Sequence, residues 1–203
     1  MLSLNEILLS DDPSGILCVY ATDNNCRLKP KWEKLLLSFK SLQHLYYYVV
    51  NIINGRWPEA EPTLMKDPYY TYCYSYFVIK GRWLEAEPTL MKDPQWAFNY
   101  ADDIIKGKWL EAEPTIMKDP QYAYYYAKYV IKDRWPEAEP YIKKSPGSAF
   151  YYAVKVLKDR WPEAEPYILN DLYWCTDYKN YFYNNEIHSP MSEKWIVSDW
   201  SKI

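Results

Sequence analysis

A tandem repeat of 26 residues constrains this chain more than any other feature of its sequence. Near-identical blocks recur in register, such as RWPEAEPTLMKDP from Arg56 and RWLEAEPTLMKDP from Arg82. The tryptophans that mark the five clear copies are Trp57, Trp83, Trp109, Trp135 and Trp161. A unit this short cannot bury its own apolar face, so consecutive units must stack and share a core.

The second half of each unit predicts a helix with both ends marked. An Asp or Ser stands at the N-cap, and Pro follows at the first helical position in four of the five copies. Lys80-Gly81 and Lys106-Gly107 place a basic residue in the last turn and a glycine at the C-cap. A small residue at the fourth position, with apolar residues at the eighth, eleventh and twelfth, predicts one buried stripe. The predicted helices span 68–80, 94–106, 120–132, 146–158 and 172–184.

The first half of each unit, as in Trp57-Pro58-Glu59-Ala60-Glu61-Pro62, is punctuated by two prolines four residues apart. A regular helix across both would lose a hydrogen bond and clash at the second proline. We therefore predict a tight 3₁₀-like turn through PEAE and one short helical turn over PTLMK. Each tryptophan is expected to wedge between successive units. The tyrosine at the seventh position of every long helix is expected to pack inside and to give its hydroxyl a partner.

These features predict an all-α solenoid with a short repeat and terminal caps. Residues 30–185 are the expected array, with five clear copies and one degenerate copy that carries Trp32 and Glu33. In this degenerate copy, Tyr48 corresponds to Tyr74 of the next unit. Residues 1–29 and 186–203 are the expected N-terminal and C-terminal caps.

Composition excludes several classes of protein. The 24 basic and 27 acidic residues give a net charge of -3, unlike a basic DNA-binding domain or a strongly acidic DNA mimic. No apolar run is long enough to span a membrane, and the N-terminus lacks the basic start and cleavage site of a signal peptide. The four cysteines are scattered. We expect a cytoplasmic protein without disulfides.

No motif indicates catalysis, a metal or a cofactor. His44 and His188 are the only histidines, and neither has a second ligand at metal-binding spacing. The repeated glutamate pairs, such as Glu59 and Glu61, occur in five equivalent settings. An acid/base pair instead needs two carboxylates in different environments. We expect these glutamates to pair with the Arg or Lys that precedes each tryptophan, and we expect a non-enzymatic protein.

Three helix positions vary while the rest of the unit repeats, namely the sixth, ninth and tenth. Exposed aromatic side chains anchor protein interfaces, so these columns predict a surface that binds another protein. The alternative is drift at solvated positions. The candidate protein-binding residues are Tyr76, Phe77, Asn99, Asp102, Asp103, Tyr125, Lys128, Tyr129, Tyr151, Lys155 and Tyr181.

A second hypothesis is single-stranded nucleic-acid binding, in which the tryptophans stack bases and the preceding cations hold phosphates. It predicts an open tryptophan column and an affinity that falls steeply with salt. The candidate nucleic-acid-binding residues are Arg56, Arg82, Lys108, Arg134 and Arg160.

The tandem W-P-E-A-E-P-x-I-M-K-D-P block, followed by x-W/Y-A-Y-Y-Y-A-K-x-V-I-K, resembles a short helical repeat of tailed-bacteriophage proteins and related bacterial proteins. In period and punctuation it is also similar to leucine-rich-variant and HEAT-like α-solenoids. The resemblance covers about three-quarters of the chain and implies a scaffold without catalytic residues. It also implies a viral protein in the host cytoplasm that binds and inhibits a host factor, such as a defence nuclease.

Overall fold

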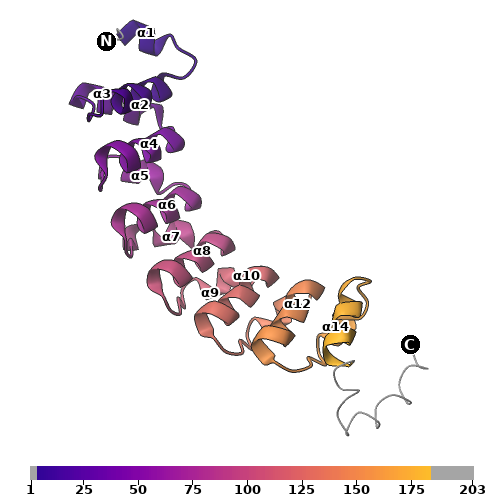
Figure 1. The fold of residues 1–203 in the computed structure, drawn as a ribbon. Coiled ribbons are helices and arrows are strands. Elements are labelled where there is room, and N and C mark those ends of the chain that lie inside the picture. The colour runs from indigo at the N-terminus through magenta and orange to yellow at the C-terminus, as the bar shows by residue number, and fades with distance from the viewer. Residues whose placement is uncertain (1–3, 184–203) are drawn as a thin grey trace. The chain divides into compact units, whose positions relative to one another are not determined.

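The computed structural model describes residues 4–183, which form short helices joined by tight turns, with no strand among them (Figure 1). The predicted all-α repeat architecture is confirmed. The predicted C-terminal cap, 186–203, lies outside the described residues. Within the described part, no helix is long and apolar enough to cross a membrane.

The chain divides into two compact units, Met1–Lys106 and Gly107–Ile203. The boundary falls inside the predicted array, between its second and third clear copies. The first unit contains α1 (Leu4–Leu8), α2 (Pro13–Asp23), α3 (Pro30–Phe39), α4 (Leu42–Tyr48), η1 (Val49–Ile53), α5 (Glu61–Leu64), α6 (Pro68–Tyr74), η2 (Ser75–Ile79), η3 (Leu84–Ala86), α7 (Glu87–Leu90), α8 (Pro94–Tyr100) and η4 (Ala101–Ile105).

The second unit has the same alternation of a four-residue helix and a longer one. Within each unit the longer helices of consecutive repeats lie side by side (Figure 1). The elements of the second unit are α9 (Glu113–Ile116), α10 (Pro120–Tyr125), η5 (Tyr126–Ile131), α11 (Glu139–Ile142), α12 (Pro146–Tyr152), η6 (Ala153–Leu157), α13 (Glu165–Ile168) and α14 (Trp174–Phe182).

The first half of each repeat folds as its prolines predict. The Ala60 N–H donates to the Trp57 carbonyl at 2.9 Å, which closes a tight turn, and α5 then begins at Glu61. Pro62 sits in the first turn of α5, where its missing N–H breaks no helical hydrogen bond. In the second copy the turn is a full 3₁₀ helix, η3.

The predicted caps start the longer helices. The Asp67 carboxylate accepts from the Tyr70 N–H at 3.1 Å, and Asp93, Asp119 and Ser145 cap their helices in the same way. In the last copy Leu172 stands in place of proline, and regular helix begins only at Trp174. Asp171 still accepts from the Trp174 N–H at 3.0 Å.

The predicted glycine C-caps are wrong. The helices α6, α8, α10 and α12 each end in a π-helical turn, and the left-handed residue after it is lysine, with φ between 57° and 60°. In the degenerate copy α4 ends in the same kind of turn, and the left-handed residue is Asn54. No glycine has a positive φ. The π turn closes one residue further along than an α turn. In each of the four clear copies the left-handed residue is the lysine whose N–H closes the π turn, and a glycine follows it only in the first two copies. These lysines are Lys80, Lys106, Lys132 and Lys158.

The core follows the predicted stripe. The small residues Thr71, Ala97, Ala123 and Ala149 are fully buried, and the alanine before the inner glutamate of each block is buried as well. The five repeat tryptophans are only 2–4% exposed, which confirms their position as wedges. Tyr74 and Trp83 illustrate the packing, with ring centroids 5.0 Å apart.

The left-handed lysines give a paired prediction. Lys158→Gly should raise the free energy of unfolding by roughly 0.5–1 kcal/mol, because glycine adopts positive φ without the steric cost that a Cβ carries. Lys155→Gly, three residues earlier on the same helix, should lower it by about as much. Urea denaturation of the two variants checks the signs, and equal signs would contradict the assignment of the cap.

Candidate functional site

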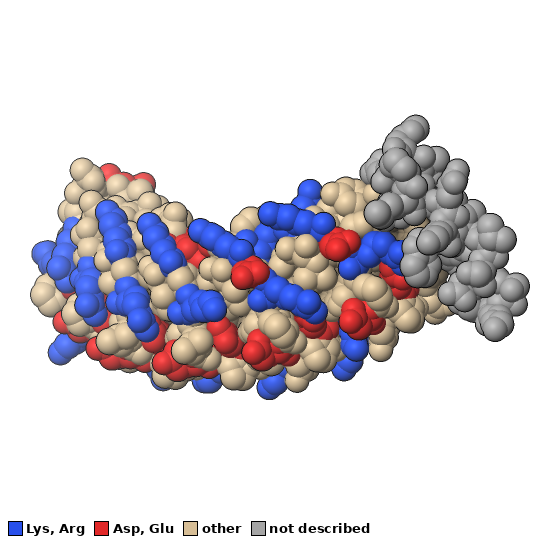
Figure 2. All heavy atoms as spheres, turned by 90° about the horizontal axis from the view of Figure 1, so that it is seen from below, with Lys and Arg blue, Asp and Glu red and all other residues tan. Residues whose placement is uncertain are grey.

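Charged side chains of both signs lie along one face of the molecule (Figure 2). The arginines that precede four of the tryptophans pair with the inner glutamate of the same block. Arg56 Nε donates to Glu61 Oε1 and Arg56 Nη2 to Glu61 Oε2, both at 2.9 Å. The same bidentate pairing joins Arg82 to Glu87, Arg134 to Glu139 and Arg160 to Glu165. The expected Arg–Glu pairing is confirmed, and it raises the pKa of Arg134 further above its ordinary value.

The same glutamate also binds the buried tyrosine of its own repeat. The Tyr74 hydroxyl accepts from the Trp57 N–H at 2.8 Å and donates to Glu61 Oε1 at 2.9 Å. Each such tyrosine is completely buried. We call this set of Arg, Trp, Glu and Tyr the repeat latch. The tyrosines that make both contacts in the five clear copies are Tyr74, Tyr100, Tyr126, Tyr152 and Tyr178.

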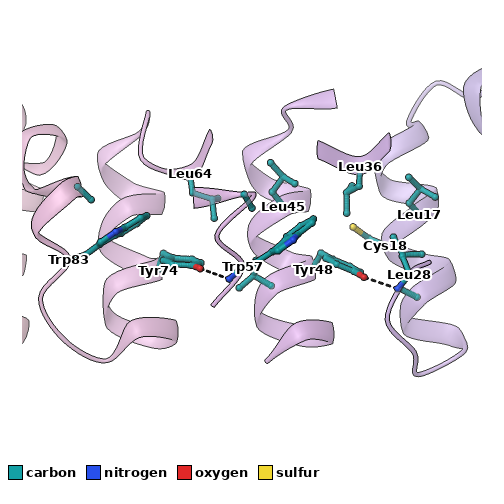
Figure 3. Close-up of a cluster of buried hydrophobic side chains, with 14 of the residues drawn as sticks. Leu17, Cys18, Leu28, Leu36, Leu45, Tyr48, Trp57, Leu64, Tyr74 and Trp83 are labelled. Atoms are coloured by element: carbon teal, nitrogen blue, oxygen red, sulfur yellow. Dashed lines mark hydrogen bonds between the residues drawn. The ribbon is translucent and has the colours of Figure 1, made fainter. Parts of the chain in front are cut away.

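The latch also locates the degenerate copy. Tyr48 accepts from the Leu28 N–H at 2.7 Å and donates to Glu33 at 2.9 Å, while Arg27 pairs with Glu33 (Figure 3). Leu28, not Trp32, therefore occupies the position of the repeat tryptophan. This copy begins at Arg27, a few residues before the predicted start of the array.

The latch removes the arrangement that nucleic-acid stacking requires. The tryptophan rings are buried between repeats, so no base can stack on them. The guanidinium groups of Arg56, Arg82, Arg134 and Arg160 already bind carboxylates, and Lys108 takes the same place in the third copy. The open Arg-Trp column expected under this hypothesis is not formed.

The tenth helix position is the exposed column of the predicted protein-binding surface. All five of its residues are exposed, and three of them are aromatic at 44–56%. These residues are Phe77, Asp103, Tyr129, Lys155 and Tyr181.

The sixth and ninth positions are less uniform than predicted. Tyr76 and Tyr151 are exposed, and Asn99, Asp102, Tyr125 and Lys128 are half-buried, as the burial of each residue shows. Cys73 and Val154, in the same two columns, are buried. The prediction used the 3.6-residue period throughout, whereas a π turn holds roughly one more residue. In α6, α8, α10 and α12 the ninth and tenth positions lie inside this turn, so the 3.6-residue period does not fix their exposure.

In the first unit this surface rests on packed aromatic rings. Trp96 contacts Tyr69 and Tyr72, with ring centroids 5.2 and 5.4 Å away, and Tyr72 stacks on Tyr76 at 5.9 Å. The Tyr72 hydroxyl donates to Asp103 Oδ2 at 2.6 Å, and burial together with this carboxylate raises the pKa of Tyr72. The rings thereby fix the exposed carboxylate of the tenth column.

The second unit places cations among its rings instead. Lys128 Nζ lies 4.4 Å from the Tyr129 ring centroid and donates to the Tyr129 hydroxyl at 2.8 Å. Tyr124 and Tyr151 stack at 6.1 Å across neighbouring helices. The variable columns thus carry Asp102 and Asp103 in the first unit but lysines in the second.

Sequence reasoning missed the rings beneath this surface. Trp96, Tyr122 and Trp174 occupy the third helix position, and Tyr72, Phe98, Tyr124 and Phe150 the fifth. Their recurrence at the 26-residue period was the available signal. In the described part of the chain, no three His, Cys, Asp or Glu side chains lie close enough together to hold a metal ion.

Comparison of the chain with protein-family models, with curated proteins and with solved structures found no match.

The latch predicts a difference between two adjacent tyrosines. Tyr152→Phe should lower the free energy of unfolding by about 1–3 kcal/mol, because it leaves the buried Trp135 N–H without its acceptor. Tyr151→Phe keeps an exposed ring and should change stability by less than about 0.5 kcal/mol. Chemical denaturation of both variants checks this. Equal losses would show that the hydroxyl contact does not stabilise the repeat.

The latch tyrosines also predict instability in alkali. Burial raises the pKa of Tyr100 to about 12, above its ordinary value near 10. The folded state therefore holds this proton more tightly, so its stabilising effect is complete below pH 10 and is lost as pH rises towards 12. Deprotonation of each such tyrosine should lower the free energy of unfolding by about 1.4 kcal/mol per pH unit in that window. Denaturation midpoints measured from pH 8 to 11 check this, and a flat profile above pH 10 would contradict it.

Proposed function

We propose that this chain is a non-enzymatic scaffold that binds another protein through the variable helix face of its repeats. The observation that carries the proposal is the tenth column, in which all five residues are exposed and Phe77, Tyr129 and Tyr181 each contact another aromatic ring. Aromatic side chains held in one orientation lose little conformational entropy on binding. They therefore favour a protein interface over an idle surface.

Charge adds specificity to this surface. Asp102 and Asp103 favour a basic segment of the partner at the first unit, while Lys128 and Lys155 favour an acidic segment at the second. The buried latch supplies the rigid frame, so the variable columns can differ between copies without disturbing the fold.

The resemblance to bacteriophage repeats extends the proposal to a host protein as the partner, with inhibition as the outcome. Under this proposal the protein works in the host cytoplasm, and a defence nuclease is a candidate target. Affinity purification from an infected bacterial host, followed by an activity assay on the captured protein, tests this extension.

The binding face is tested by a triple substitution, Tyr125→Ala, Lys128→Ala and Tyr129→Ala. We expect it to weaken partner binding at least tenfold while the far-ultraviolet circular dichroism spectrum is unchanged, because interface aromatics contribute about 2 kcal/mol or more each. Leu110→Ala with Lys118→Ala is the matched control, since both residues are exposed but lie outside the variable columns.

Site-specific photocrosslinking separates the face from the rest of the surface. A photoreactive phenylalanine at position 129 should crosslink the partner, and one at position 110 should not. Crosslinking from position 110 alone would overturn the proposed face. Binding of a single-stranded oligonucleotide that weakens steeply between about 50 and 200 mM salt would favour nucleic acid instead.

A further inference from the structure

A cavity lies on the first unit where α2 faces α4. Its volume is about 860 Å³, within the range typical of small-molecule sites. Residues of the α1–α2 turn, α2 and α4 line it. They are Ser10, Asp11, Asp12, Gly15, Ile16, Cys18, Val19, Tyr20, Asp23, Gln43, His44 and Tyr47.

A change in the repeat pattern explains why this space is open. The third helix position of α6 is Tyr70, whose ring packs against Tyr46 of the preceding helix at 5.7 Å. The same position of α4 is His44, which faces the small residue Ser14 of α2, with its Nδ1 2.8 Å from Ser14 Oγ. The contact between His44 and Ser14 takes the place of the ring pair that Tyr70 and Tyr46 form in the next repeat, and the groove beside it is open.

Charge is concentrated at the two ends of this groove. Asp12 caps α2 and Asp23 is its last residue, eleven positions later. Eleven residues make about three helical turns, so both carboxylates lie on the same face, roughly 16 Å apart along the axis. Asp11 adds a second carboxylate at the first end.

The wall between these ends is largely apolar. Ile16, Val19 and Tyr20 lie four, seven and eight residues after Asp12, on the same face of α2 as the two carboxylates. Tyr47 of α4 adds a ring on the opposite side. Among the residues that line the cavity there are three carboxylates and no lysine or arginine.

One end of the groove is already organised. Asp12 Oδ1 accepts from the Gly15 N–H at 2.9 Å, and its Oδ2 lies 3.5 Å from His44 Nε2. The hydrogen bond from Gly15 holds the pKa of Asp12 below its ordinary value, so this carboxylate is ionised at neutral pH. A second hydroxyl, from Ser41, lies 3.0 Å from His44 Nδ1 and fixes the imidazole ring.

We propose that this groove binds a linear aliphatic polyamine. The terminal ammonium groups would pair with Asp11 and Asp12 at one end and with Asp23 at the other. The methylene segments would lie against Ile16, Val19 and Tyr20, because alternating charge and apolar surface on the ligand matches that of the wall. Tyr20 and Tyr47 supply ring faces that attract organic cations. This function is independent of protein binding along the repeats.

Isothermal titration calorimetry of the full chain with spermine and with putrescine tests the proposal. Spermine should bind at least tenfold more tightly, because putrescine is too short to reach both ends. Asp23→Asn should weaken spermine binding about tenfold and leave putrescine binding unchanged, since only the longer ligand reaches that carboxylate. Glu163→Gln, an exposed carboxylate of the second unit, is the charge-matched control and should change neither affinity.

A second variant keeps the test decisive if Asp23→Asn does not fold. Val19 is 58% exposed at the groove, so Val19→Trp should block the groove without disturbing the core, and spermine binding should be lost. Absence of spermine binding, an equal effect of Glu163→Gln, or full binding by both groove variants would each overturn the proposal. Binding of a lysine-rich peptide but not of spermine would assign the groove to a protein side chain and would also overturn it.

Discussion

The hydrogen bond from each repeat tryptophan N–H to a buried tyrosine hydroxyl is the contact on which the repeat depends. It joins the turn that opens a unit to the longer helix of the same unit, 17 residues later. The hydroxyl in turn donates to a glutamate that an arginine holds in a bidentate pair. A buried donor without an acceptor costs more than the hydrogen bond contributes, so every member of the set is constrained by the others. This coupling explains why the Arg, Trp, Glu and Tyr positions repeat together.

The latch also determines which side chains of each repeat are buried. Its aromatic rings are inside, and the arginines of four clear copies are occupied by carboxylates, which leaves the outer helix face free to vary. Two exposed residues of the tenth column, Asp103 and Tyr181, contact rings of the fifth position, Tyr72 and Phe150. Variation at the surface and constancy in the core are thus two consequences of one packing scheme.

The groove between α2 and α4 lies at the point where the repeat pattern changes. A tyrosine or tryptophan at the third position fills the space beside the preceding helix in α6 and α8. Histidine replaces it in α4, and the small residue Ser14 faces it from α2. The groove therefore lies where His44 takes the position of an aromatic residue of the repeat and the small residue Ser14 stands opposite it.

Much of the fold could be predicted from residue types alone. Proline spacing excluded a continuous helix and required a turn followed by a short helix, and Asp or Ser before Pro marked where the longer helices begin. The arginine and glutamate of each block were expected to pair because catalysis needs unlike environments, which identical repeats do not provide. These are local effects, which depend on backbone sterics and short sequence separation.

The remainder required the tertiary structure, because it depends on how backbone and side chains meet across distance. A left-handed lysine closes each π turn, and the ninth and tenth positions lie inside that turn; the 3.6-residue period could reveal neither feature. The sequence did not show that Leu28 takes the tryptophan position, because Arg27 and Glu33 are six residues apart, whereas the Arg and Glu of the clear copies are five apart. The sequence by itself determined the repeat, its stacking and its buried stripe, since a 26-residue unit has no other way to bury that stripe. Only the packed structure decided which side chains face outward and where a groove stays open, because both depend on the volume of neighbouring side chains.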